Sequence, residues 1–198
     1  MSSIDLLKYD GRVPRYTSYP TAAQFHSGIG PGTARQWLSV LEASYLIHLV
    51  RPHHRNFRKR LVKAPKLYFT DVGLAAYLLD ITQERQLATH PLRGALFETF
   101  VLAEMVKARY HRGLPENFYY WRDKTGNEID VLIEKGSKLL PLEIKSGQTV
   151  SKDAFKGFEY WKKTAGKAAG KAFLVYAGTK DGIHSGVRLL GWRSPVLW

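Results

Sequence analysis

Apolar and polar side chains alternate most regularly in two neighbouring segments of the C-terminal half. These segments are Asn127–Glu134 (NEIDVLIE) and Leu139–Ser146 (LLPLEIKS), and such alternation is typical of strands with one buried face. Between them lies Lys135–Lys138 (KGSK), in which Gly136 and Ser137 suit the tip of a tight turn. The pattern predicts a β-hairpin, and its two-residue tip fixes the register of the strands.

The predicted register gathers ionisable side chains on one face of the hairpin. It pairs Glu134 with Leu139, Leu132 with Pro141, Asp130 with Glu143 and Glu128 with Lys145. The opposite face is apolar and predicts a contact with the core, through Ile129, Val131, Ile133, Leu140, Leu142 and Ile144.

Two of the ionisable side chains, Asp130 and Glu143, oppose one another directly in this register. Carboxylates whose Cβ atoms lie about 5 Å apart repel, and a divalent cation with oxygen ligands is the usual group that holds them. Lys145 lies on the same face, where it can position a water or stabilise a developing anion. The alternative is a solvated face on which Glu143 pairs with Lys145, or on which Glu128 occupies the lysine.

The periodicity upstream of the hairpin predicts a partial winged helix over residues 33–90. It indicates a helix that Thr33 caps, strands over Tyr45–Val50 and Lys66–Thr70, and a helix over Gly73–Leu79 that Asp71 or Thr70 caps. Residues 81–91 are predicted to be a polar connector. Residues 1–32 are rich in Pro, Gly, Ser and Tyr, so we expect a loop-rich, disordered arm.

Residues 91–198 predict a second domain, built around the hairpin. The expected elements are a helix over Arg93–Arg109, a strand over Phe118–Arg122, the hairpin, a helix over Lys152–Ala165, and strands over Ala172–Tyr176 and Val187–Trp192. This order predicts an α/β (α+β) fold, in which helices pack against a mixed sheet.

The composition narrows the classes of function. The chain has 198 residues and no cysteine, which excludes disulfides, cysteine-ligated zinc, iron–sulfur clusters and thiol catalysis. We find neither a secretory signal nor an apolar run long enough to span a bilayer, so we expect a cytoplasmic protein without a membrane partner. A formal net charge of +13 favours an anionic partner, and nucleic acid is the commonest one.

One stretch, Arg51–Lys63 (RPHHRNFRKRLVK), concentrates the positive charge. We expect its basic side chains to lie along the phosphate backbone of DNA, as wings of winged helices do. The residues concerned are Arg55, Arg58, Lys59, Arg60 and Lys63. The alternative is a loop that docks on an acidic protein partner. His53 and His54 have no further ligands clustered nearby, so they do not predict a metal site.

Five stretches in a fixed order resemble a known family. They are WLSVLEASYLIHLV, PHHRNF with KRLVKAPKLYFTDVGLAAYLL, HPLRGALFETFVLAEM, FYYWRDKTGNEIDVLIE and LPLEIKSGQTV. Over residues 33–192 the chain resembles the C-terminal region of prokaryotic AAA-type ATPases, catalogued as domain-of-unknown-function family 4143. The resemblance implies a winged-helix-like segment followed by a PD-(D/E)XK domain, with the mixed sheet and flanking helices of restriction-endonuclease-like folds.

The same resemblance implies a set of site residues. Asp130 followed by Glu143-Ile144-Lys145 matches the PD-(D/E)XK motif, so Asp130 and Glu143 are expected to bind Mg²⁺ or Mn²⁺ while Lys145 orients or activates water. Glu98 stands where an acid of the first helix often joins the site, and Gln148 where a polar residue after the lysine often helps. Alternatively, Glu98 is a surface acid stabilised by the helix dipole, and Gln148 is a turn residue.

The N-terminal arm resembles a different family. Leu6–Gly30 contains VPRYTSYPTA, which is similar to the start of oxygen-independent coproporphyrinogen III oxidase, a radical-SAM enzyme. In that family three cysteines follow and bind a 4Fe–4S cluster; this chain has none, so we expect neither the cluster nor its chemistry. No G-x-x-x-x-G-K-[ST] occurs either, so we expect no ATP site. Our interpretation is that a short oxidase-like start replaces the ATPase domain usual in the first family.

Two functions from different classes follow from the sequence. The first is a metal-dependent phosphodiesterase that acts on DNA through Glu98, Asp130, Glu143 and Lys145. The second is a non-catalytic module that keeps the nuclease-like fold and binds DNA or docks on a protein. The intact motif favours the first function, and the missing ATPase domain favours the second.

Overall fold

The computed structural model describes residues 30–53, 64–123 and 125–194, which form two compact units. The first unit contains residues 30–49 and 64–103, and the second contains residues 50–53 and 104–194. Most of the expected N-terminal arm lies outside the described residues, as do all five basic residues of the predicted DNA-binding loop. No helix within the described ranges is both long and apolar enough to cross a bilayer.

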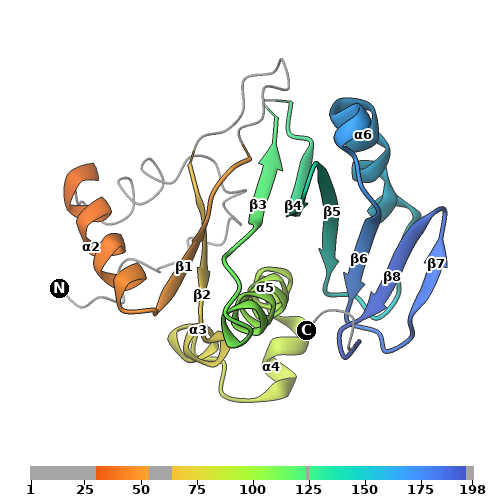
Figure 1. The fold of residues 1–198 in the computed structure, drawn as a ribbon. Coiled ribbons are helices and arrows are strands. Elements are labelled where there is room, and N and C mark those ends of the chain that lie inside the picture. The colour runs from red at the N-terminus through yellow and green to blue at the C-terminus, as the bar shows by residue number, and fades with distance from the viewer. Residues whose placement is uncertain (1–29, 54–63, 124, 195–198) are drawn as a thin grey trace. The chain divides into compact units, whose positions relative to one another are not determined.

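The first unit follows the predicted order of elements. It contains helix α2 (Pro31–Ala43), strands β1 (Ile47–Val50) and β2 (Lys66–Phe69) paired in a two-stranded sheet, helices α3 (Val72–Leu78) and α4 (Glu84–Thr89), and the start of α5 (Arg93–His111) (Figure 1). Asp71 caps α3, since its Oδ1 accepts hydrogen bonds from the backbone N–H groups of Gly73 at 2.6 Å and Leu74 at 3.2 Å.

The clearest differences from the prediction in this unit are the start of α2, the start of β1 and the additional helix α4. Helix α2 begins at Pro31 and not after a Thr33 cap, because proline at the first helical position already has a helical φ. The strand predicted from Tyr45 begins at Ile47, because Tyr45 has a left-handed φ of 56°. The predicted polar connector includes helix α4, whose start is stabilised by the Gln86 side chain, which accepts from the backbone N–H of Gln83 at 2.8 Å.

The second unit is built on a six-stranded mixed sheet with the order β3-β4-β5-β6-β8-β7 (Figure 1). The strands are β3 (Phe118–Arg122), β4 (Glu128–Lys135), β5 (Lys138–Lys145), β6 (Ala172–Tyr176), β7 (Gly182–His184) and β8 (Val187–Gly191). Helix α6 (Lys156–Ala165) lies between the short 3₁₀ helices η2 (Lys152–Phe155) and η3 (Gly166–Ala168). The β5–β6 and β6–β8 pairs are parallel, and the other three pairs are antiparallel. The predicted mixed α/β fold with flanking helices is confirmed. Among the six strands of this sheet, only the short edge strand β7 was not predicted.

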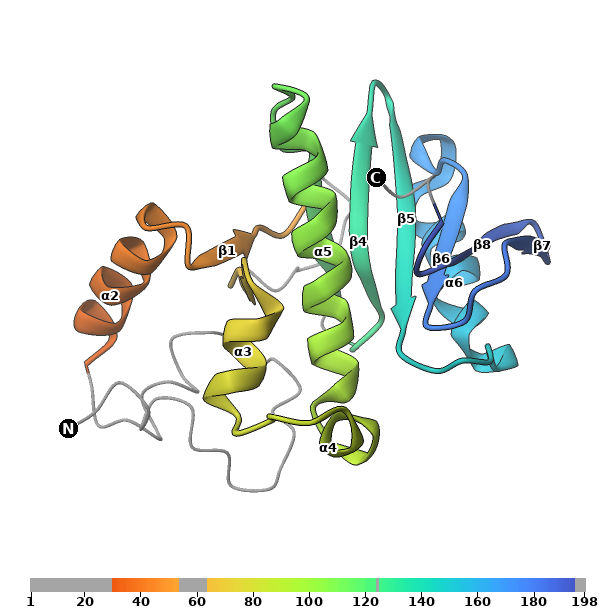
Figure 2. The same cartoon turned by 90° about the horizontal axis from the view of Figure 1, so that it is seen from below.

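Strands β4 and β5 form a hairpin (Figure 2). Its register is the predicted one as far as the ladder extends. Glu134 pairs with Leu139 and Leu132 with Pro141, and the last pair of the ladder is Val131 with Leu142. Beyond that pair the start of β4 pairs with β3, while the end of β5 pairs with β6. The predicted pairs of Asp130 with Glu143 and of Glu128 with Lys145 therefore lie past the end of the ladder.

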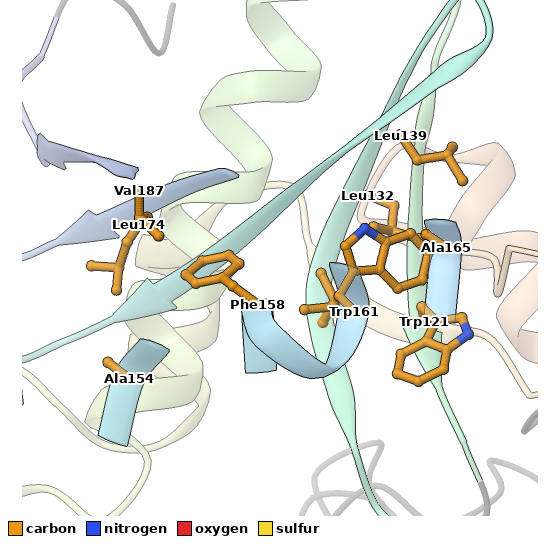
Figure 3. Close-up of a cluster of buried hydrophobic side chains, with 10 residues drawn as sticks. Trp121, Leu132, Leu139, Ala154, Phe158, Trp161, Ala165, Leu174 and Val187 are labelled. Carbon is orange, nitrogen blue, oxygen red and sulfur yellow. The ribbon is translucent and has the colours of Figure 1, made fainter. Parts of the chain in front are cut away.

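Helix α6 packs on the face of the hairpin that the sequence predicted to be ionisable. Near the turn this face carries Leu132 and Leu139, both fully buried, in one cluster with Phe158 and Trp161 of α6 (Figure 3). Trp161 also meets Trp121 of β3 edge to face, with ring centroids 5.3 Å apart. The opposite face is buried further along, at Val131 and Leu142. Asp130, Glu143 and Lys145 gather toward the open end of the hairpin.

Candidate active site

Three residues of the predicted site come together at the open end of the hairpin. Lys145 Nζ lies 2.7 Å from Glu143 Oε2 and 3.7 Å from Asp130 Oδ2, so one ammonium group bridges two carboxyl groups. All three residues belong to the second unit. The strands that carry them are fixed by the hairpin turn on one side and by the pairing of β5 with β6 on the other.

Asp130 is tied directly to the strand that carries the other two residues. Its Oδ2 accepts a hydrogen bond from the backbone N–H of Ile144 at 2.9 Å. This contact lies past the last ladder pair, where the carboxylate serves as the acceptor for a backbone donor of β5. The position of Asp130 relative to Glu143 is therefore set by a hydrogen bond to the main chain.

Glu143 is buried, with 7% of its surface exposed. Gly157, the second residue of α6, lies so close that a Cβ there would be 3.3 Å from Glu143 Oε1. Burial raises the pKa of Glu143 from 4.5 to about 8, and the charge of Asp130 adds to the rise, while Lys145 opposes it. Near neutral pH this carboxyl consequently holds a proton unless another cation stabilises its charge.

The donor set of this cluster suits a hard divalent cation. Two carboxyl groups face one ammonium group, and such cations bind carboxylate oxygens together with water. Within the described ranges, no three His, Asp or Glu side chains gather into a metal-binding group. A cation held here would take two protein ligands, Asp130 and Glu143, and would compete with Lys145 for them.

The other predicted site residues lie in different surroundings. Glu98 belongs to the first unit, where its Oε1 accepts a hydrogen bond from the Tyr68 hydroxyl and lies 3.3 Å from Lys66 Nζ. A cavity of about 10 Å³ adjoins these three side chains. Gln148 lies in an exposed bend after β5. The roles of both residues in the site stay predictions.

Glu128 has a partner that the hairpin prediction did not include. Its Oε2 lies 3.7 Å from Arg122 Nε, across the β3–β4 pair in which the two residues face one another. The sequence interpretation considered only a pairing of Glu128 with Lys145.

Sequence reasoning missed Asp123, which is 2% exposed at the end of β3. Its carboxylate accepts hydrogen bonds from the backbone and side chain of Thr125, from the backbone and side chain of Asn127, and from the Tyr160 hydroxyl at 2.8 Å. Burial alone would raise the pKa of Asp123, but the bonds from Thr125, Asn127 and Tyr160 lower it from 3.8 to about 2. Because Tyr160 belongs to α6, this carboxylate joins the β3–β4 turn to the helix that covers Glu143. An Asp followed by Lys-Thr-Gly-Asn is a turn signal that was open to sequence reasoning.

Comparisons with known proteins gave two family matches. Residues 93–191, half of the chain, match a family model described as "Domain of unknown function (DUF4143)", and residues 16–85 match one described as "Domain of unknown function (DUF8612)".

Similar proteins were found in four bacteria. Uncharacterised proteins of Mycobacterium bovis and Mycobacterium tuberculosis are each 29% identical over 162 residues, which cover 74% of this chain and 36% of theirs. This chain thus spans little more than a third of the length of these curated relatives. Oxygen-independent coproporphyrinogen III oxidases match shorter stretches. The enzyme of Pseudomonas aeruginosa is 71% identical over 28 residues, 14% of this chain and 6% of its own. The enzyme of Paracoccus denitrificans is 43% identical over 53 residues, 27% of this chain and 11% of its own.

Proposed function

The chain belongs to the DUF4143 domain family, and from this premise we propose that its second unit is a nuclease-like, DNA-binding module that hydrolyses phosphodiester bonds with a divalent cation. The observation that carries the proposal is the cluster of Asp130, Glu143 and Lys145, in which one lysine bridges two carboxyl groups. The order of these residues along two neighbouring strands agrees with the PD-(D/E)XK motif.

The energetics of the cluster support a functional role over a purely structural one. Burying a carboxyl group beside another carboxylate costs free energy, as the raised pKa of Glu143 reflects. A hairpin that needed only a soluble surface would leave both groups in water. A carboxyl group with a strongly perturbed pKa, next to a second carboxyl group and a lysine, is typical of catalytic and metal-binding sites.

Each residue has a distinct role in the proposed chemistry. Asp130 and Glu143 would hold the divalent cation through their oxygen atoms. The cation, when bound, would polarise the phosphoryl group and lower the pKa of a bound water. Lys145 would orient the attacking water and stabilise the negative charge that develops on the phosphate. The hydrogen bond from Ile144 would keep Asp130 in place when Lys145 turns toward the substrate.

The positive charge of the whole chain supports the proposed binding to DNA. The formal net charge of +13 favours association with a polyanion. We assign the main phosphate contacts to Arg55, Arg58, Lys59, Arg60 and Lys63, on the basis of the sequence alone.

The second candidate function is a non-catalytic module for DNA binding or protein docking. The observation that favours it is the short contact of Lys145 Nζ with Glu143 Oε2 at 2.7 Å, because the lysine already occupies the place beside the two carboxyl groups where a metal would bind. Such a module would keep the nuclease-like fold but would not hydrolyse phosphodiester bonds.

A nuclease assay on single-stranded and double-stranded DNA separates these functions. The parent protein, Asp130→Asn, Lys145→Met and the control Glu134→Gln are compared in Mg²⁺, in Mn²⁺ and in EDTA. Glu134 lies on the same hairpin but opposite Leu139, away from the cluster. We expect metal-dependent cleavage by the parent and the control, and a loss of at least about a hundredfold in the two site variants. DNA binding without cleavage by the parent would support the second function, and cleavage by Asp130→Asn at the parent rate would refute the site.

A further inference from the structure

An open pocket adjoins the cluster within the second unit. Its volume is about 380 Å³, and it is lined by Lys145, Thr149, Val150, Ser151, Asp153 and Ala154. These residues come from the end of β5, from the turn that follows it, and from η2 at the start of the α6 segment. Lys145 belongs both to the cluster and to the wall of the pocket, so a ligand in the pocket meets the side chain that bridges the two carboxyl groups.

The chemistry of the walls suits a phosphorylated ligand with an apolar part. Lys145 supplies a cation, and Thr149 and Ser151 supply hydroxyl groups that donate to phosphate oxygens. Val150 and Ala154 supply apolar surface for a sugar or base.

The carboxylate of Asp153, which lies in the wall of the pocket, is neutralised by a neighbouring lysine. Asp153 Oδ1 lies 2.6 Å from Lys156 Nζ, so this carboxylate has a cation beside it. Both side chains are exposed, with relative accessibilities of 77% and 78%, and can turn away when a ligand enters.

We propose that this pocket binds one nucleotide of single-stranded DNA, next to the phosphate that is cleaved. The proposal rests on the proposed function and specifies the form of its substrate. Ligand pockets in proteins span roughly 300–1,000 Å³, so a pocket of about 380 Å³ has the size to take one nucleotide. A base that enters the pocket to contact Val150 and Ala154 has to leave its partner in a duplex, so the expected substrate is a single strand or a frayed end.

The test measures binding in EDTA, so that it does not depend on turnover. A fluorescein-labelled single-stranded hexanucleotide is titrated with the protein at low salt, and binding is followed by fluorescence anisotropy. Thr149→Trp fills the pocket from an exposed position, and Thr149→Val with Ser151→Ala removes the two hydroxyl groups. Thr179→Trp is the matched control, because Thr179 is an exposed threonine of the same unit that does not line the pocket.

We expect both pocket variants to bind the hexanucleotide about tenfold more weakly. Thr149→Trp occupies the space that the nucleotide would take, and in the double variant each lost hydrogen bond weakens binding severalfold. The control should bind within about twofold of the parent, as surface changes away from a contact usually do. Equal binding by Thr149→Trp and Thr179→Trp would overturn the proposal, as would a parent that does not bind the single strand.

A parallel cleavage assay in Mg²⁺ keeps the two proposals apart. If the parent does not cleave DNA but the pocket variants bind the single strand more weakly than the parent does, the pocket is supported and the catalytic function is refuted. Cleavage by the parent with an unchanged KM in Thr149→Trp would refute the pocket and leave the catalytic function standing.

Discussion

Gly157 of helix α6 lies against the buried carboxyl group of Glu143. A Cβ at Gly157 would be 3.3 Å from Glu143 Oε1 and 3.4 Å from the carbonyl oxygen of Glu128. The missing side chain lets the first turn of α6 cover the carboxyl, and this burial is the main cause of its raised pKa. The docking of one helix turn thus sets the protonation of the candidate site.

Gly157→Ala should therefore not raise the free energy of unfolding, although glycine-to-alanine changes in helices usually do. Gly32, also the second residue of its helix, has nothing within 4 Å of its Cβ position, so Gly32→Ala should stabilise the protein by up to about 1 kcal/mol. At position 157 the added methyl group would lie 3.3 Å from Glu143 Oε1, so the carboxyl group or α6 must shift by a few tenths of an ångström. We expect this shift to offset the gain and to lower the pKa of Glu143. Urea unfolding and an NMR titration of the Glu143 carboxyl measure both effects. Equal stabilisation by the two changes, with the pKa of Glu143 unaltered, would contradict this account.

The raised pKa of Glu143 also predicts how stability depends on pH. Folding raises this pKa from 4.5 to about 8, so the folded state holds a proton that the unfolded state has released. The resulting stabilisation is complete below pH 4.5 and is lost as the pH rises to about 8. Relative to Glu143→Gln, the free energy of unfolding of the parent should fall with a slope approaching roughly 1.4 kcal/mol per pH unit. Urea titrations in EDTA between pH 5 and pH 9 test this slope, and a constant difference between the two proteins would refute it.

Asp123 should have the opposite pH dependence. Its folded pKa of about 2 lies below the ordinary 3.8, so its contribution is present above pH 3.8 and is lost as the pH falls toward 2. At pH 7, Asp123→Asn should lower the free energy of unfolding by about 2–3 kcal/mol, because several buried donors lose a charged acceptor. Tyr160→Phe removes one of these bonds and should cost about 1 kcal/mol. An Asp123→Asn protein that unfolds at the parent urea concentration at pH 7 would show that this network contributes little.

The basic loop predicts the salt dependence of DNA binding. Replacing Arg55, Arg58, Lys59 and Arg60 together by Ser should weaken binding to all sequences alike and flatten its salt dependence by roughly three to four units of slope. Mn²⁺ binding should survive this change, because none of the four belongs to the carboxyl cluster. Salt titrations of DNA affinity measure the slope, and an unaltered slope would favour the alternative, a loop that docks on an acidic protein.

Much of this fold was accessible from sequence because its signals are local. The two-residue tip of Gly136 and Ser137 fixes the register of the hairpin as far as the pair of Val131 with Leu142. Past that pair, the contacts of Lys145 with Asp130 and Glu143 bring the three predicted residues together. The family resemblance expected over residues 33–192 is confirmed over residues 93–191, and the oxidase resemblance is confirmed as a short match. The likeness to AAA-type ATPases and to PD-(D/E)XK nucleases stays a prediction.

What the sequence did not yield depends on contacts between distant segments. The role of Gly157 depends on how α6 docks on β5, and the low pKa of Asp123 depends in part on a hydroxyl group 37 residues away. Strand β7 has only three residues, all exposed, so no apolar alternation marks it. Helix α4 begins at a Gln83–Gln86 pair, in which glutamine replaces the serine or threonine that usually signals a helix start.

Asp130 and Glu143 are proposed to form one metal site, and the proton that Glu143 holds allows metal binding there to be measured directly. Because the pKa of Glu143 is about 8, a cation that binds this carboxyl at pH 7 must displace a proton. Isothermal titration calorimetry with Mn²⁺, in two buffers of different ionisation enthalpy, counts the protons released. We predict about one proton per bound ion in the parent and in Glu134→Gln, and no binding in Asp130→Asn or Glu143→Gln. Binding by Asp130→Asn as strong as by the parent, or no binding by the parent at millimolar Mn²⁺, would contradict the assignment of this site.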